Sequence, residues 1–423
     1  MWAVLDANSY FCSVERTFHP WLAGKPVCVL SSNDGIIVAL TGEAKALGLH
    51  RGDPVFKVRD IVERGGVSVF STNMMLYAAM SERVQGIIRR SVDYCESYSI
   101  DEMFCDLNGY EKHYNLEDYM RGVADRIRLW TDIPVSVGVA PTKTLAKMAS
   151  RFAKEYRGYR SVCMIDSEEK RRTALAMFPL EDIWGIGRRT CDKLISLGID
   201  TPLALADMPE AWVGRHFSKP GIQTWKELNG CPCIDTAEIV RRQSITTSRS
   251  FGEMISSIVQ VKESVASFTA SCANKLRAQG SVAGAITVFI CSNSFREDLE
   301  QYRNAATHEF PVPTSDIVEM TGAAMRMVEK IWKPGIKYKK SGVILDRISP
   351  QSCIQRDIFD VVKDREGRMK LSGTVDMMNR RFGLGTLGLA VQGDRRMQPW
   401  RVKCEMRSGN YLTDIREILT VKA

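Results

Sequence analysis

The chain has 423 residues, of which 44% are hydrophobic and 26% charged, a composition typical of folded globular proteins that excludes a disordered or collagen-like chain. No apolar run reaches about 18 residues, so we expect no membrane-spanning helix. Met1–Asp6 lacks the basic start of a signal peptide, and the twelve cysteines are scattered without zinc-binding spacing. Both observations favour a cytoplasmic protein. The net charge of +8 is uneven, because residues 1–235 hold 29 Lys and Arg against 30 Asp and Glu, whereas residues 236–423 hold 29 against 20; this excess favours a polyanion such as nucleic acid as partner.

The first part of the chain predicts short strands that alternate with helices. A segment rich in turn residues, 20–74, predicts a small separate lobe. The other predicted elements, in order, are a strand at 1–7, a helix at 75–92, two short strands within 94–109 that meet near Asp101 and Glu102, a helix at 116–131, a strand at 134–140 and a helix at 142–154.

The helix at 142–154 predicts two distinct faces. An apolar stripe at helical spacing predicts the face that packs on the core, and its members are Leu145, Met148, Ala149 and Phe152. Lys143, Lys147 and Lys154 share a second face. This second face is either an ordinary solvated surface or a row of cations that faces phosphate groups.

The second part of the chain changes character twice. Residues 180–235 predict small helices, and from residue 245 strands and helices follow in the order β-α-β-β-α-β, a ferredoxin-like arrangement. The expected elements are strands at 245–251, 283–292, 305–312 and 341–348 and helices at 259–279 and 314–333. The tail, 351–423, is basic, rich in Gly and Met, and only weakly periodic.

Three carboxylates form the first candidate site. Asp6 ends an apolar strand, and Asp101 and Glu102 lie at the predicted corner between two strands. Carboxylates among apolar strand residues are costly to bury unless they are paired or bind a metal. If the strands are neighbours, the three acids are suited to two Mg²⁺ ions that assist phosphoryl transfer. The alternative is that they are surface acids at strand ends.

A glycine turn forms the second candidate site. Gly185-Ile186-Gly187 precedes a predicted helix, as in the hairpin of a helix-hairpin-helix. The two glycines would let backbone N–H groups approach a DNA phosphate at a helix N-terminus. The alternative is an ordinary helical turn.

Taken together, these motifs resemble those of the Y-family translesion DNA polymerases, and most of all its UmuC branch. The segments that carry the resemblance occur in order along nearly the whole chain: Asp6–Glu15, Asn33–Gly35, Glu43–Gly48, Gly52–Pro54, Tyr98–Glu102, Thr142–Lys147, Trp184–Gly187 and Ser248–Gly252. The resemblance implies an α+β right-hand polymerase with a ferredoxin-like palm. Its parts would be a palm (1–20 and 75–165), fingers (21–74), a helix-hairpin-helix thumb (166–235), a β-α-β-β-α-β little finger (240–350) and a partner-binding tail (351–423).

The resemblance also implies roles for single residues. Asp6, Asp101 and Glu102, with the carbonyl of Ala7, would hold two Mg²⁺ ions. Phe11 matches the steric gate that excludes the ribose 2′-OH, with Tyr10 as the alternative.

For the triphosphate, Lys154 matches a contact residue, and Tyr10 is a further candidate. Gly42 and Lys45 stand where the family usually has a tyrosine and an arginine. This departure makes Lys45 the expected substitute at the triphosphate.

The implied activity is error-prone, template-directed DNA synthesis without proofreading in the SOS response to DNA damage. The implied partners are primer-template DNA, dNTP, UmuD-type accessory subunits, a RecA filament and a sliding clamp. Gln355, Ile358 and Phe359 resemble a clamp-binding peptide, although they could instead belong to a short helix packed on the protein itself. Two other function classes stay open: a nucleotide cyclase, which also carries paired carboxylates on such a palm, and a catalytically silent DNA-binding scaffold.

Overall fold

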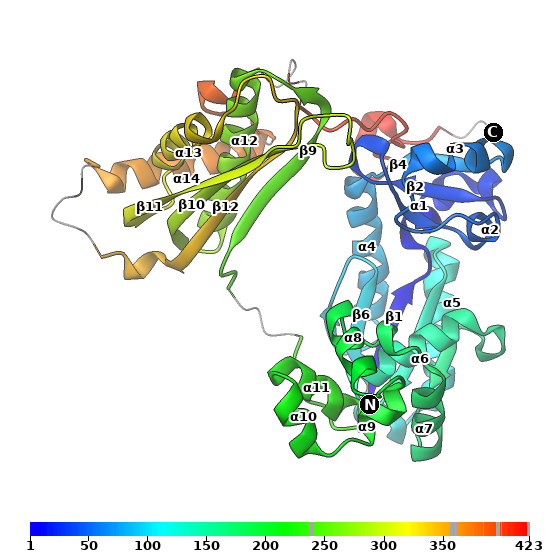
Figure 1. Cartoon of the computed structure of the whole chain (residues 1–423). Helices are drawn as coiled ribbons and strands as arrows, with labels where there is room; N and C mark the ends of the chain where they lie inside the picture. Colours follow the sequence, from blue (N-terminus) through cyan, green and yellow to red (C-terminus); the bar gives the residue numbers. More distant parts are fainter. Residues whose placement is uncertain are drawn as a thin grey trace. The chain divides into compact units, whose positions relative to one another are not determined.

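The computed structural model describes residues 1–236, 241–355, 360, 362–383, 385–394, 398 and 400–420. The chain forms two compact units, one of Met1–Ile239 with Glu405–Ala423 and one of Val240–Cys404 (Figure 1). Each unit has a hydrophobic core of its own. Within the described ranges, no helix combines the length and the apolar composition that a bilayer span requires.

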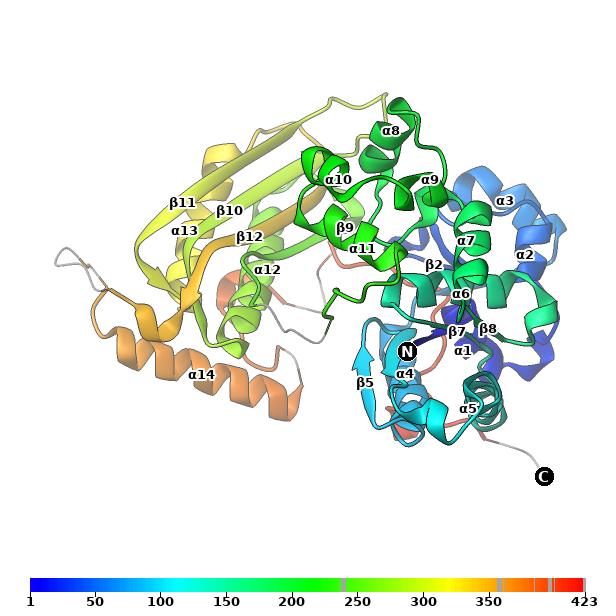
Figure 2. The same cartoon turned by 90° about the horizontal axis from the view of Figure 1, so that it is seen from below.

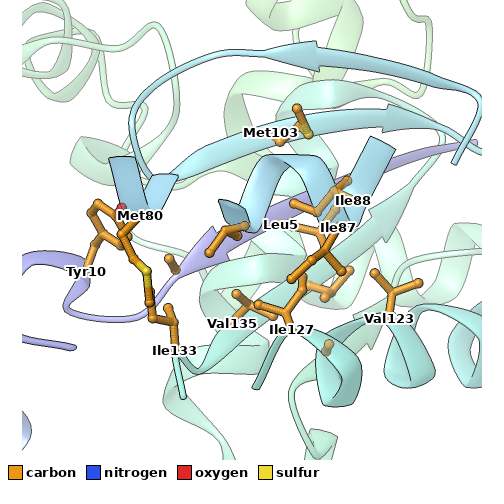
Figure 3. Packing of buried hydrophobic residues seen from close by; sticks show 14 of the residues in the cluster. Leu5, Tyr10, Met80, Ile87, Ile88, Met103, Val123, Ile127, Ile133 and Val135 are labelled. Atoms are coloured by element: carbon orange, nitrogen blue, oxygen red, sulfur yellow. The ribbon is translucent and has the colours of Figure 1, made fainter. Parts of the chain in front are cut away.

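A five-stranded sheet is the centre of the first unit. Its strands, in the order β5-β6-β1-β7-β8, are β5 (Tyr94–Ser97), β6 (Glu102–Asp106), β1 (Trp2–Ala7), β7 (Val135–Ala140) and β8 (Val162–Met164). Two helices, α4 (Met74–Arg89) and α5 (Leu116–Thr131), pack on one face of the sheet. On that face Leu5 and Val135 meet Ile87 and Ile127 (Figure 3). The predicted helix at 116–131 is therefore confirmed, as are the two strands that meet near Asp101.

Helix α6 (Lys143–Glu155) covers the opposite face of this sheet. It begins at Thr142, whose Oγ1 accepts a hydrogen bond from the Leu145 N–H at 3.3 Å. The helix lies very close to β7, because a Cβ on Gly138 would be 2.0 Å from the Ala146 carbonyl oxygen. This close packing brings the lysines of α6 to the ends of β1 and β6.

A smaller sheet and a helical region complete the first unit. The sheet, ordered β3-β2-β4, contains β2 (Val27–Leu30), β3 (Ile37–Leu40) and β4 (Ser68–Ser71), and the helices near it are α1 (Tyr10–Phe18), α2 (Gly42–Ala46) and α3 (Val55–Arg64). The helical region contains α7 (Glu168–Met177), α8 (Arg188–Ser196), α9 (Pro202–Ala206), α10 (Glu210–His216) and α11 (Lys219–Leu228). The last residues of the chain return to this unit, where Arg407 forms a parallel bridge to Ser71 at the end of β4 (Figure 1).

The second unit has the element order that the sequence predicts. Its sheet, ordered β11-β10-β12-β9, contains β9 (Ile245–Ile255), β10 (Ser281–Ser292), β11 (Arg303–Thr314) and β12 (Tyr338–Pro350). Two helices, α12 (Ile258–Ala278) and α13 (Ile317–Ile331), pack on one and the same face of this sheet and bury it (Figure 2). The β-α-β-β-α-β prediction is therefore confirmed.

One long helix, α14 (Arg365–Phe382), lies in the weakly periodic tail. Ser372 is the one fully buried residue among its described positions, so the helix has no apolar stripe that a periodicity search could find. Ion pairs hold it instead: Arg277 bonds both carboxylate oxygens of Asp376 at 2.6 and 2.8 Å, and Arg365 lies 3.0 Å from Glu319.

Candidate active site

The three candidate carboxylates lie at one edge of the five-stranded sheet. β1 and β6 are antiparallel neighbours, and their register places Asp6 opposite Glu102. The Ala7 N–H donates a hydrogen bond of 2.9 Å to the Asp101 carbonyl, which continues the pairing by one residue. Strand pairing thus brings Asp6 together with two acids that lie 95 and 96 residues further along the sequence.

A cavity of about 430 Å³ opens beside this edge. It brings two acids, Asp6 and Glu102, together with two of the predicted phosphate contacts, Lys45 from α2 and Lys154 from α6. The other lining residues are Thr144, Lys147, Met148, Ser150, Arg151, Glu155, Phe178, Asp182, Ile183 and Trp184. The cavity therefore presents carboxylates and cations to the same space, as a site for a metal-bound polyanion requires.

The lysine face of α6 is paired with carboxylates. Lys154 Nζ lies 3.2 Å from Asp6 Oδ2, and Lys147 Nζ lies 2.7 Å from Glu102 Oε1. Lys143 forms a buried pair, at 2.6 Å, with Glu96, in which its side chain is 3% exposed. Lys143 is therefore neither solvated nor placed to face a phosphate group, the two roles that the sequence left open for this face. Lys147 and Lys154, in contrast, line the cavity.

Negative charge is crowded around Asp6. Burial raises the pKa of Asp6, and the neighbouring charges of Glu102 and Asp101 raise it further, while Lys154 opposes them. The carboxylate edge consequently favours added positive charge, beyond what Lys154 supplies.

The Asp101 side chain has a different position from the other two acids. Its Oδ1 accepts a hydrogen bond of 2.5 Å from Ser99 Oγ, and Asp101 lines a second, smaller cavity together with Ala7, Tyr10 and Glu102. Among the described residues, no three His, Cys, Asp or Glu side chains converge closely enough to form a metal-binding group. The structure thus unites Asp6 with Glu102 and places Asp101 next to them with its side chain turned to Ser99.

The two adjacent aromatic residues at the start of α1 have different environments. Tyr10 is 4% exposed, and its hydroxyl donates a hydrogen bond of 2.6 Å to the Tyr77 carbonyl. Phe11 is partly exposed and stacks on the Tyr77 ring with the centroids 4.5 Å apart. Tyr10 is therefore a core residue in this structure, and Phe11 is the one of the pair that is accessible.

The glycine turn has the conformation expected of a tight hairpin. Gly185 has a φ of 92°, and a Cβ there would be 2.5 Å from Thr224 Oγ1 on α11. Gly187 is the N-cap of α8, and both glycines are exposed, whereas the Ile186 side chain is buried. Ile186 thus anchors the turn while the backbone on either side of it faces outward.

The predicted clamp-binding peptide lies only partly within the described residues. Gln355 is exposed after β12, but Ile358 and Phe359 lie outside the described residues.

Sequence reasoning missed Arg151 and Trp184 as cavity residues, because one belongs to α6 and the other to the glycine turn, and no shared motif links them. Arg151 lies 2.5 Å from Asp182 and so connects these two segments.

Comparison with known proteins identifies the family. Models of the impB/mucB/samB family match residues 5–151, those of its C-terminal domain match 242–358, and a domain of unknown function matches 369–421. The UmuC protein of Salmonella typhimurium is 39% identical over 424 residues and covers 100% of both chains, and DNA polymerase IV of Moorella thermoacetica is 27% identical over 91% of this chain and 94% of its own.

The solved structure of a Y-family DNA polymerase chimera of Dbh and Dpo4 covers 83% of this chain and 100% of its own, with a TM-score of 0.64 and 21% identity. This structural match shows the fold, and the full-length match to UmuC shows the family. The chain belongs to the impB/mucB/samB family, is UmuC-like over its full length, and has the fold of a Y-family DNA polymerase.

Proposed function

We propose that this polymerase extends primers across damaged template positions in the SOS response, and that the cavity beside Asp6 and Glu102 receives the incoming dNTP. The observation that carries this proposal is the meeting of two carboxylates with Lys45 and Lys154 in one cavity. A nucleoside triphosphate brings several negative charges and its own divalent cation, so it needs both kinds of group.

Two Mg²⁺ ions would be held at the carboxylate edge. The donors fit such ions, because carboxylate oxygens are the ligands that Mg²⁺ prefers and because the crowded charge around Asp6 favours added cations. Asp6 and Glu102 supply oxygens from paired strands, Asp101 supplies the third carboxylate once it leaves Ser99, and the Ala7 carbonyl is a further donor. The chemistry that two such ions would supply is activation of the primer 3′-OH and neutralisation of charge on the leaving pyrophosphate.

The lysines of the cavity would bind the phosphates of the nucleotide. Lys154 now neutralises Asp6 at 3.2 Å, and it is free to turn toward a phosphate oxygen when another cation compensates that carboxylate. Lys45 lies on the short helix α2 and is exposed. As a point charge it would contact one phosphate oxygen at a time rather than two. The buried position of Tyr10 gives no support to its predicted contact with the triphosphate.

Phe11 would act as the steric gate for the sugar. Its ring is partly exposed on α1, five residues after Asp6 in the sequence, and is held against Tyr77. A ring fixed at the sugar of the nucleotide leaves no space for a 2′-OH. Tyr10 is buried and hydrogen-bonded, so it does not compete for this role.

Two surfaces would bind the DNA. The exposed backbone at Gly185 and Gly187 is accessible to a phosphate at the start of α8. In the second unit, the strand register places Arg303 and Lys340 on either side of Cys291, on the sheet face that α12 and α13 leave uncovered. This face combines cations with small polar side chains, as a phosphate-binding surface does.

We expect the double variant Arg303→Gln and Lys340→Gln to bind primer-template DNA with a weaker dependence on salt. Each lost phosphate contact releases one fewer counterion, so the slope of log affinity against log salt should become shallower by up to about 0.9 per contact. Fluorescence anisotropy of labelled DNA over a range of NaCl concentrations measures this slope. Lys330→Gln removes an exposed cation from α13 on the helical side and should leave the slope as it is. Equal slopes for the parent and the double variant would exclude this face from the DNA interface.

The full-length similarity to UmuC also supports proposed partners. UmuD-type accessory subunits and a RecA filament would activate the polymerase in the cytoplasm. Gln355 would belong to a sliding-clamp peptide with Ile358 and Phe359, and its exposed position is compatible with such contact.

A further inference from the structure

The C-terminal segment Glu405–Tyr411 is bound to the edge of the small sheet in the first unit. The Ser71 N–H donates to the Met406 carbonyl at 3.0 Å, and the Met406 N–H donates back to Ser71 Oγ at 2.9 Å. Asn73 Nδ2 then donates to the Ser408 carbonyl at 2.9 Å. The segment therefore has a defined register beside β4, more than 330 residues away in the sequence.

A buried carboxylate lies directly beneath this segment. The side chain of Glu15 on α1 is 0% exposed, and its Oε1 accepts two hydrogen bonds, from Tyr77 Oη at 2.6 Å and from Ser408 Oγ at 2.9 Å. Its Oε2 accepts none from the described residues, although His19 Nδ1 lies 3.8 Å away. Burying a carboxylate is costly, so the two hydroxyl donors are needed to hold it.

Tyr77 connects this carboxylate to the proposed gate. The Tyr77 side chain is fully buried, and its ring stacks on Phe11 at an interplanar angle of 17°. Burial and the charge of Glu15 raise the pKa of Tyr77, so its hydroxyl stays protonated and continues to donate. A continuous chain of contacts therefore runs from Ser408 through Glu15 and Tyr77 to Phe11.

We propose that the C-terminal segment sets sugar selectivity, with Ser408 and Glu15 as positioning residues that hold Tyr77 and, through it, the ring of Phe11. The segment lies within residues 369–421, which match a domain of unknown function. This inference rests on the proposed role of Phe11 as steric gate. It adds a function for a part of the chain that is remote from the active site in the sequence.

The selectivity ratio separates this role from simple structural support. Loss of support alone would lower the use of deoxynucleotides and ribonucleotides by the same factor. A displaced gate would instead raise ribonucleotide use relative to deoxynucleotide use, because the Phe11 ring excludes the 2′-OH less strictly when the ring can move.

The test is single-nucleotide primer extension by the full-length chain with Ser408→Ala, measuring kcat/KM for dCTP and for CTP opposite a template G. We expect the dCTP/CTP ratio to fall about tenfold, the effect of one lost hydrogen bond to a charged group, while kcat/KM for dCTP changes by less than about threefold. Ser408→Thr keeps the hydroxyl and should retain the parental ratio. Thr413→Ala removes an exposed hydroxyl of the same tail and is the matched control.

The Phe11→Ala background distinguishes the failure of this inference from the failure of the gate. If Phe11→Ala relaxes selectivity and Ser408→Ala retains the parental dCTP/CTP ratio, the C-terminal segment does not affect sugar selectivity, and Phe11 is still the steric gate. If the double variant is more permissive than Phe11→Ala alone, Ser408 does not act through Phe11 and the inference is wrong.

Should Ser408→Ala not fold, Tyr77→Phe breaks the same chain of contacts at the next bond, from Tyr77 Oη to Glu15 Oε1, while it keeps the stacked ring. The expected result is again a fall in the dCTP/CTP ratio. An unchanged ratio in Tyr77→Phe, or an equal loss with both nucleotides, would overturn the proposal.

Discussion

Primer extension by the Asp101→Asn variant is expected to fall at least about a hundredfold, with DNA affinity close to that of the parent. The substitution removes one negative charge where the metals and the transition state need it, and losing such electrostatic stabilisation costs about this much or more. Asn keeps an oxygen that can accept the hydrogen bond from Ser99 Oγ, so the local structure should survive. Glu102→Gln should have an effect of similar size, although it also leaves Lys147 without its partner at 2.7 Å.

The matched control for these variants is Asp106→Asn at the far end of the same strand β6. It makes the same chemical change away from the cavity and should retain parental extension. Thermal unfolding and DNA anisotropy are measured for all three variants, because a misfolded protein would also be inactive. Folded, DNA-binding Asp101→Asn with parental extension rates would show that this carboxylate takes no part in the chemistry.

Phe11→Ala is expected to raise ribonucleotide incorporation, relative to deoxynucleotide incorporation, by about a hundredfold. The change removes a clash with the 2′-OH and requires no new contact. Deoxynucleotide use should persist, because the carboxylates and lysines of the cavity are untouched. The measurement is kcat/KM for paired dNTP and rNTP substrates on one primer-template.

The neighbouring residue provides the control for the gate. Tyr10→Phe removes the hydroxyl that bonds to the Tyr77 carbonyl at 2.6 Å but keeps a ring of the same size in the core. Its sugar selectivity should stay within about threefold of the parent, with some loss of stability from the unpaired carbonyl. If Phe11→Ala stays fully selective while it still uses deoxynucleotides, the gate lies at another residue.

Much of the fold could be predicted because periodic burial leaves a clear pattern. The apolar stripe of 116–131 and the apolar strand at 134–140 face one core, and the structure has both within one residue of the prediction. Helix α14 could not be predicted, because ion pairs such as Arg277 with Asp376 attach it and an ion pair leaves no periodic signal. The segment Glu405–Tyr411 was missed for a related reason, since its contacts are single hydrogen bonds and one ring contact to residues far away in the sequence, which leave no periodic pattern.

The candidate site was predictable in part. Motif resemblance pointed to Asp6 and Glu102, and strand register explains why they meet. Resemblance alone could not show that Asp101 turns to Ser99 or that Lys143 is buried against a carboxylate, because rotamers and ion pairs depend on tertiary neighbours.

The most direct test of the central claim is extension of a labelled primer on a template with one abasic site, by the full chain with Mg²⁺, dNTP, UmuD-type subunits and RecA. We predict that the primer grows past the lesion, that growth depends on the template and on Mg²⁺, and that Asp101→Asn abolishes it. The same reaction is analysed for cyclic nucleotides, which we expect to be absent. Template-independent nucleotide cyclisation, or no primer growth on either damaged or undamaged template with all these components present, would contradict the assignment of this chain as a translesion polymerase.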